Sequence, residues 1–341
     1  MWKKICTQID DCRVWYKITC QRGRILATDP EAWRRYAGPP PFASPETFFP
    51  CNGAVPPVRI TGETGFAGGR VRRLEFPTLH PLPFPETNRA VGHLYTPASR
   101  PDAPVVVLSH GWAHRGRGGV ERLYVRPFLR RGLAVLLMEH PLHFERTPAG
   151  ATSGELMVSG DAVLTVEAFR QAVTDTGAAV NYLVSRGLGR WGLFGYSLGG
   201  YIAALLACIR DDAAFLVVAG CGDSIISPIL ETDLGRNVRE DLSLSGLADR
   251  EKLETFWGAI SPSRWAPALP RDRVLMVAGR YDRIMLPGSV ERLWRAWGRP
   301  EIRWLPRGHY TLLASPSALM RHALPFIRQR VSSQESARRG C

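Results

Sequence analysis

The most constraining feature of this chain is an apolar run that ends in a turn with a serine at its apex. Residues 191–200 read Trp-Gly-Leu-Phe-Gly-Tyr-Ser-Leu-Gly-Gly, and an apolar helical stretch follows. The pattern predicts a buried strand, a one-residue turn at Ser197 and a helix. Such a tight turn forces Ser197 toward a positive φ, and glycines at positions 195 and 199 let the two backbones approach. The hydroxyl of Ser197 is therefore expected at the end of a strand and the start of a helix.

From about residue 70 onward, strand and helix patterns alternate. Besides the strand before Ser197, apolar runs predict strands at residues 71–76, 90–95, 105–108, 133–138, 215–219, 274–277 and 302–305. Helical patterns are found at residues 120–131, 156–184, 289–297 and 312–328. This alternation indicates an α/β fold with a mostly parallel central sheet and helices on both faces. In such a sheet the functional site is expected at the carboxyl ends of the strands.

Three segments fall outside this alternation. Residues 1–65 are rich in proline and aromatic side chains and are expected to form an extended arm packed on the core. After the sixth predicted strand, residues 222–270 contain helical segments but no strand pattern. This interruption of the alternation predicts a cap insertion over the site. The core domain is expected to span residues 66–330, and residues 331–341 to form a flexible tail.

Composition and charge narrow the class of protein. The 341 residues are 45% apolar and 22% charged, typical of a globular domain, and the formal net charge is +13. Arginines carry most of this charge and are scattered, which argues against a nucleic-acid partner and gives no specific support to peripheral membrane contact. No apolar run approaches the roughly 20 residues that span a bilayer, and no apolar segment follows Lys3 and Lys4, so no secretory signal is expected. Seven cysteines without metal-binding spacing indicate reduced thiols in a cytoplasmic protein.

A serine presented in this way becomes a nucleophile when a base and an acid lie beside it, and the chain offers both. His309 follows the last predicted strand and is the expected base that takes the proton of Ser197. Asp282 follows the strand at residues 274–277 and is the expected acid that orients His309. Asp223, just after the preceding strand, is an alternative acid.

The turn after the strand at residues 105–108 is expected to supply a backbone N–H donor near Ser197. It reads Ser-His-Gly-Trp, and its glycine lets the backbone turn toward the site. The backbone N–H groups of Trp112 and Leu198 are predicted to form an oxyanion hole. The pocket is further expected to be bordered by His110, Gly111, Tyr196 and His140. The irregular spacing of histidines and acids predicts no metal, and the mechanism requires no cofactor.

With these motifs in this order, the chain resembles the α/β-hydrolase superfamily from about residue 70 to 328. Arg126-Pro127, His140-Pro141 and the long helix before the serine turn are similar to a branch of α/β-hydrolase-domain proteins, the DUF2048-like group. The resemblance implies a serine hydrolase that cleaves an ester, or a similar acyl bond, of a small-molecule or lipid-like substrate, with a carboxylesterase favoured. A peptidase, thioesterase or acyltransferase of the same fold and a non-catalytic binding protein are the alternatives. The sequence gives no indication of oligomeric state.

Overall fold

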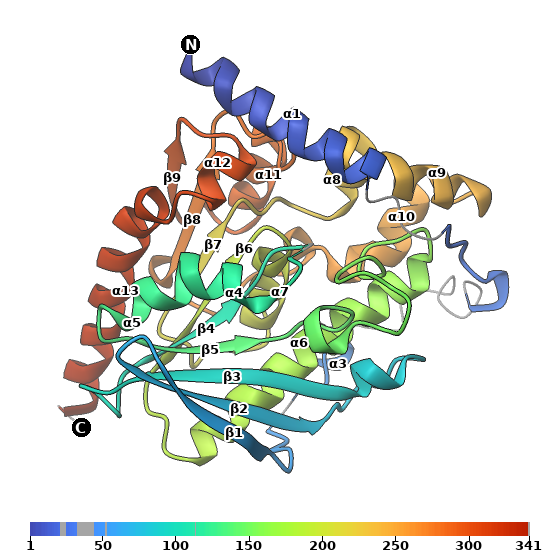
Figure 1. Cartoon of the computed structure of the whole chain (residues 1–341). Coiled ribbons are helices and arrows are strands. Elements are labelled where there is room, and N and C mark those ends of the chain that lie inside the picture. The colour runs from blue at the N-terminus through green and yellow to red at the C-terminus, as the bar shows by residue number, and fades with distance from the viewer. Residues whose placement is uncertain (21–24, 33–43, 52, 113, 340–341) are drawn as a thin grey trace.

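A nine-stranded sheet runs through the centre of the computed structural model, which describes all residues except 21–24, 33–43, 52, 113 and 340–341 (Figure 1). Its strands are β1 (Arg59–Phe66), β2 (Gly69–Pro77), β3 (Arg89–Pro97), β4 (Val105–Ser109), β5 (Ala134–Met138), β6 (Trp191–Tyr196), β7 (Leu216–Ala219), β8 (Val274–Gly279) and β9 (Glu301–Leu305). They lie in the order β1-β2-β3-β5-β4-β6-β7-β8-β9. The pairs from β1 to β5 are antiparallel and all others are parallel, which confirms the predicted mostly parallel sheet.

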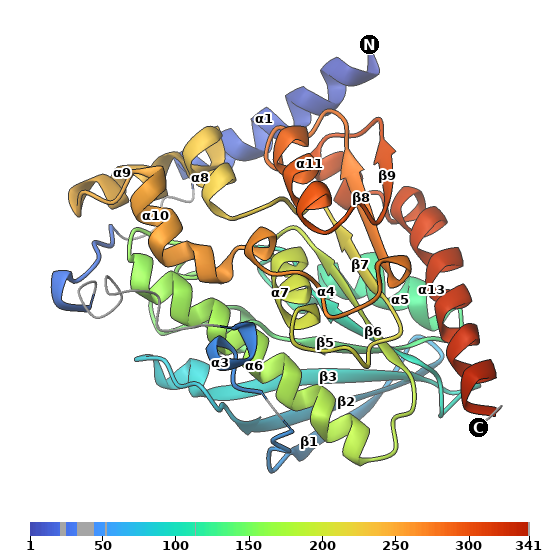
Figure 2. The ribbon, with the colours of Figure 1, turned by 180° about the vertical axis from the view of Figure 1, so that it is seen from behind.

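Helices cover both faces of the sheet (Figures 1 and 2). They are α1 (Trp2–Cys20), α3 (Pro45–Phe48), α4 (Arg117–Val120), α5 (Arg126–Leu129), α6 (Ala162–Ser185), α7 (Leu198–Ala207), α8 (Ile226–Glu231), α9 (Arg236–Leu244), α10 (Arg250–Trp257), α11 (Pro287–Ala296), α12 (His309–Leu313) and α13 (Pro316–Arg339). One apolar core lies under α6, α7 and α11, and the other lies under α5 and α13. Alternate residues of β4 serve the two cores: Val107 enters the first and Val106 the second.

Local side chains set the limits of the longest central helix. The sequence pattern places its start near residue 156, but α6 begins at Ala162. Asp161 precedes it, and its Oδ1 accepts the backbone N–H groups of Val163 and Leu164 at 3.1 and 3.0 Å. A carboxylate in this position satisfies N–H groups that have no acceptor within the helix. Asp161 therefore fixes where the helix starts.

The first 65 residues differ from the extended arm that the sequence predicts. The chain opens with helix α1, which crosses the top of the molecule in Figure 1 and packs on α12. The edge strand β1 begins at Arg59, so the sheet starts before residue 66. The proline run at 39–41 lies outside the described residues. At the other end, α13 continues to Arg339, where the sequence predicts a tail from residue 331.

The segment 222–270 forms the helices α8, α9 and α10. It follows the seventh strand rather than the sixth, because the sheet contains β1, for which the sequence pattern predicts no strand. Its helix α10 packs on α6 and α8. Among the described residues, no helix combines the length and the apolarity that crossing a bilayer requires.

Candidate active site

Ser197 occupies the turn between β6 and α7 with φ of +52°, which confirms the predicted positive φ. The close approach of the two backbones depends on glycine. A Cβ on Gly195 would lie 2.1 Å from the carbonyl oxygen of Gly199, and one on Gly199 would lie 2.1 Å from that of Ser109. The backbone N–H of Ser197 donates to Ala219 on β7 at 2.9 Å. The serine is thus held in a strained conformation at the carboxyl edge of the sheet.

His309 and Asp282 lie in line with this serine. Nε2 of His309 is 3.0 Å from Oγ of Ser197, and its Nδ1 donates to Oδ2 of Asp282 at 2.8 Å. The other oxygen of Asp282 accepts the backbone N–H groups of Ile284 and Met285 at 2.8 and 2.7 Å. Burial opposes a charged imidazole, but the carboxylates of Asp282 and the nearby Asp10 outweigh it and raise the pKa of His309. The three side chains form a continuous line of hydrogen bonds.

The alternative acid, Asp223, is engaged elsewhere. Its Oδ1 accepts the hydroxyls of Ser227 and Ser289 at 3.1 and 2.5 Å, and its Oδ2 accepts Nε of Arg292 at 2.5 Å. These contacts tie the start of the 222–270 segment to α11. Asp282, not Asp223, is the carboxylate hydrogen-bonded to His309.

The loop after β4 lies beside the serine. Leu198 is the first residue of α7, so its N–H has no acceptor within the helix. Gly111 packs so closely that a Cβ there would lie 2.8 Å from the ring of Tyr196. The side chain of Trp112 is fixed by a hydrogen bond of 2.6 Å from its indole N–H to the carbonyl of Gly154.

His110 and His140 stabilise this loop through contacts with its backbone carbonyl groups. Both are almost fully buried, and their rings stack at 4.0 Å. Nδ1 of His110 lies 2.9 Å from the carbonyl oxygen of Gly111, and Nε2 of His140 lies 3.2 Å from that of His110. Burial lowers the pKa of both rings, which keeps them neutral. Neither is among the described residues that line the cavity at Ser197, so the expectation that they border it is wrong.

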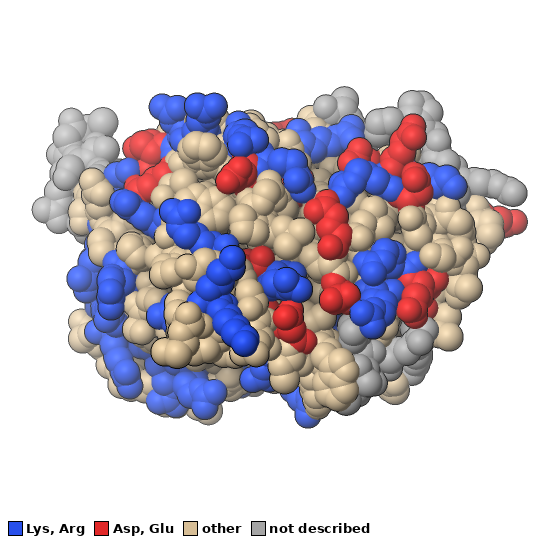
Figure 3. Space-filling model, turned by 90° about the horizontal axis from the view of Figure 1, so that it is seen from above, with Lys and Arg blue, Asp and Glu red and all other residues tan. Residues whose placement is uncertain are grey.

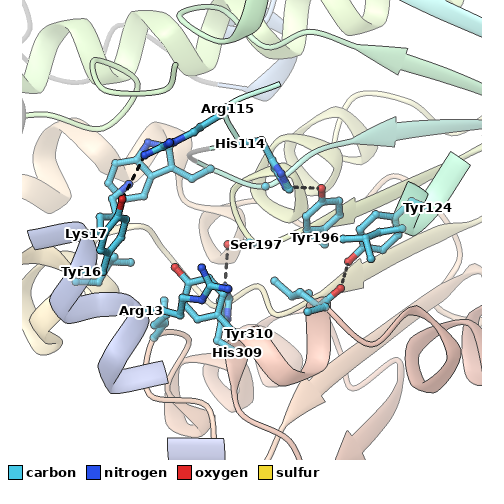
Figure 4. Close-up of a pocket in the computed structure, with 17 residues that line it drawn as sticks. Arg13, Tyr16, Lys17, His114, Arg115, Tyr124, Tyr196, Ser197, His309 and Tyr310 are labelled. Carbon is cyan, nitrogen blue, oxygen red and sulfur yellow. Dashed lines mark hydrogen bonds between the residues drawn. The ribbon is translucent and has the colours of Figure 1, made fainter. Parts of the chain in front are cut away.

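The cavity at Ser197 has a volume of about 550 Å³, within the range of small-molecule sites. Gly111, Trp112, Tyr196, Ser197 and His309 line it, as do residues that sequence reasoning missed. Figure 4 shows three of these, Arg13, Tyr16 and Lys17, projecting from α1. From the segment predicted as a cap, only Leu234 is among the described lining residues. Helix α1 therefore contributes more of this wall than the expected cap does.

A second contribution of α1 is Asp10, which is fully buried. Its Oδ2 accepts the backbone N–H of His309 at 2.8 Å and that of Arg283 at 3.3 Å, and its Oδ1 accepts that of Tyr310 at 3.0 Å. Burial raises the pKa of Asp10, although the N–H groups of His309 and Tyr310 act in the opposite direction. Its hydrogen-bond partners among the described residues are these three N–H donors, which interact more strongly with the ionised carboxylate than with the neutral acid. Asp10 thus joins the loop of Asp282 to the loop of His309.

One group of potential metal ligands occurs in the described part of the chain. His93, Glu139 and Glu145 bring their ligand atoms within 4.8 Å of one another. Guanidinium groups already serve the two carboxylates: Arg73 pairs with Glu145 at 2.6 Å, and Arg117 lies 3.7 Å from Glu139. We therefore assign no metal to this group.

Comparisons with known proteins agree with the fold. The sequence profile of the family described as "Alpha/beta hydrolase domain containing 18" matches residues 82–222. In structure, the chain is similar to an acetyl xylan esterase from Paenibacillus sp. R4, with a TM-score of 0.61 and 14% identity over 91% of this chain and 97% of that one. Acetyl xylan esterase 1 from Thermoanaerobacterium gives a TM-score of 0.58 and 18% identity over 89% and 96% of the two chains. The chain belongs to the α/β-hydrolase superfamily.

The chain is also similar to a solved peptidase structure and to a protein without an assigned function. A puromycin-hydrolyzing peptidase from Mycobacterium tuberculosis matches with a TM-score of 0.54 and 19% identity, over 80% of this chain and 46% of that one. An uncharacterized protein of the same organism is 29% identical over 218 residues, which are 60% of this chain. The present chain spans about half (49%) of the length of that relative. At these identities the solved structures show the fold alone.

Proposed function

We propose that this α/β-hydrolase is a serine hydrolase that cleaves a carboxylic ester through an acyl-enzyme on Ser197. The observation that carries the proposal is the hydrogen-bonded line from Ser197 through His309 to Asp282, which opens onto a cavity of about 550 Å³. Neutral His309 donates from Nδ1 to Asp282, so its Nε2 is free to accept a proton. This is the tautomer that a general base requires.

The reaction follows from this arrangement. Oγ of Ser197 attacks the ester carbonyl while its proton passes to Nε2 of His309. The N–H groups of Leu198 and Trp112 receive the negative oxygen of the tetrahedral intermediate. The imidazolium, stabilised by Asp282, returns its proton to the leaving alcohol, and a water molecule then releases the acid by the same steps in reverse order.

Substitution of the serine tests the proposal. Ser197→Ala should reduce hydrolysis of short-chain 4-nitrophenyl esters by about 10⁵-fold or more, to near the background. Ser185→Ala, the same change at an exposed position on α6, serves as the control. A fluorophosphonate probe should label the wild type and the Ser185 variant but not the Ser197 variant.

The same experiments separate the alternatives. Activity retained in Ser197→Ala would contradict the proposed nucleophile, and a wild type that neither labels nor turns over any ester would favour a binding protein. A matched panel of ester, thioester and amide substrates tests the bond that is cleaved, since peptidases share this fold. We expect the ester to be cleaved fastest.

A further inference from the structure

Basic side chains gather at one side of the cavity at Ser197. Arg13 and Lys17 project from successive turns of α1, and Arg115 approaches from the loop after β4. In Figure 4 these three residues lie on one side of Ser197, and Tyr124 lies on the other. No aspartate or glutamate is among the described lining residues of this cavity.

None of these three cations has a carboxylate partner within the described part of the chain. Nζ of Lys17 lies 3.2 Å from the centre of the Trp112 ring, and the guanidinium of Arg13 lies 5.8 Å from that of Tyr310. Nη2 of Arg115 donates to the hydroxyl of Tyr16 at 3.3 Å. Aromatic rings and hydroxyls hold a cation in place without cancelling its charge.

Two neighbouring arginines, by contrast, form ion pairs with carboxylates. Arg117, two positions after Arg115, pairs with Glu121 at 2.7 Å, and Arg283 beside α1 pairs with Asp11 at 3.0 Å. Over the face on which α1 lies, acidic side chains are interspersed among basic ones (Figure 3). The three cations at the cavity thus differ from Arg117 and Arg283, which each have a carboxylate partner.

Of the three cations, Lys17 shows the effect of burial on its charge. The side chain is half-buried, and its burial lowers its pKa to about 7, since no carboxylate among the described residues offsets the desolvation. A cation held out of water without a partner destabilises the folded protein. A negatively charged ligand in the cavity would remove that penalty.

We infer that the ester cleaved at Ser197 carries an anionic group, a carboxylate or a phosphate, that binds against Arg13, Lys17 and Arg115. This inference rests on the proposed function and adds to it the chemical class of the substrate. The anion lies on the α1 side of the scissile bond. The apolar remainder of the ester packs on the opposite side, where Leu123 and Tyr124 line the cavity.

Two sets of esters test the inference. For the acyl side, the mono-4-nitrophenyl ester of glutarate is compared with 4-nitrophenyl valerate, which has a methyl group in place of the carboxylate. For the alcohol side, 4-acetoxybenzoate and 4-acetoxyphenyl phosphate are compared with neutral methyl 4-acetoxybenzoate. This second set also distinguishes a carboxylate from a phosphate. We expect kcat/KM to favour an anionic ester by about tenfold or more in at least one set.

Charge-removing variants then connect the preference to the cavity. Lys17→Gln and Arg115→Gln should each lower the ratio of anionic to neutral kcat/KM by roughly threefold to tenfold. Lys4→Gln makes the same change at an exposed position of α1 and should leave the ratio unchanged. Because the ratio is taken within each variant, a general loss of active protein cancels.

Failure of this inference and failure of the proposed function would give different results. Equal turnover of anionic and neutral esters in both sets, or a ratio that Lys17→Gln and Arg115→Gln do not move, would overturn the inference and leave the serine hydrolase standing. Absence of turnover of every ester, together with no probe labelling of Ser197, would contradict the proposed function and the inference with it.

Discussion

Asp10 offers the sharpest test of how this site is held together. Its carboxylate accepts backbone N–H groups from His309, Tyr310 and Arg283, and it reaches them from a helix at the other end of the chain. A Cβ on Gly308 would lie 2.5 Å from Oδ2 of Asp10, so the contact is closely fitted. Asp10→Asn keeps the size of the side chain and replaces one acceptor oxygen by an NH₂ group.

The cost of this substitution follows from the three hydrogen bonds. If the remaining oxygen faces His309 and Arg283, the new NH₂ group faces the N–H of Tyr310, and a buried donor loses its partner. That loss costs about 1–3 kcal/mol, and the change from charged to neutral acceptor weakens the two remaining bonds by about 1 kcal/mol together. We expect the free energy of unfolding to fall by about 2–4 kcal/mol.

Activity should fall as well, because the loops of Asp282 and His309 lose their common anchor. A displacement of His309 by about 1 Å is enough for a loss of roughly 10²-fold, so we expect kcat to drop by about 10- to 100-fold with KM little changed. The negative charge of Asp10 also contributes to the raised pKa of His309. Its removal should lower that pKa and move the acidic limb of the kcat/KM profile to lower pH, because the base is active when deprotonated.

The neighbouring Asp11 provides a matched control. It is exposed on the same helix, pairs with the side chain of Arg283 at 3.0 Å and makes no hydrogen bond to His309 among those described. Asp11→Asn should leave kcat and the pH profile nearly unchanged. A wild-type kcat and pH profile in Asp10→Asn, or equal behaviour of the two variants, would refute the anchoring role of Asp10.

Three further predictions concern other parts of the site. Asp282→Asn should lower kcat by about 10³–10⁴-fold, because an amide does not hold the required histidine tautomer. Asp223→Asn should lower the melting temperature and leave kcat nearly unchanged. Equal losses of kcat in the two variants would contradict the assignment of Asp282 as the acid that orients His309. Gly199→Ala should cost about 2–4 kcal/mol in a denaturant titration, since its Cβ would lie 2.1 Å from the oxygen of Ser109, and wild-type stability would contradict the close approach. Lys17 loses its charge as the pH rises through its lowered pKa of about 7, so the preference for anionic esters should decrease over that range. A ratio of anionic to neutral kcat/KM that does not change with pH would contradict a role of Lys17 in binding.

The parts of the fold that could be predicted are those with a strong local signal. The parallel strands β4 to β8 are buried on both faces and appear as continuous apolar runs, and the serine turn follows from two glycines around one residue. The choice between Asp282 and Asp223 had no such signal, because both follow a strand of the same sheet. Strand β1 was missed because its residues are mostly exposed and show no apolar alternation.

Helix α1 is not predicted for a different reason. Its buried face carries a charged side chain, and some of its large apolar side chains are exposed. The face that packs on the protein carries Cys6, Asp10 and Val14, while Ile5 and Ile9 are exposed. Apolar periodicity therefore assigns Asp10 to solvent. Its burial is stabilised by N–H donors, one of them on His309, 299 positions later in the chain.

The sequence before α12 does hold a signal for this contact. A helix start leaves N–H groups that need acceptors, and Ser, Thr, Asp or Asn usually supplies one. The residue at that position is Gly308, which has no side-chain oxygen to offer. An acceptor for the N–H groups of His309 and Tyr310 must therefore come from elsewhere, and Asp10 supplies it. Asp10 thus takes the place of an N-cap side chain for α12, and this contact explains why the first helix forms part of this site.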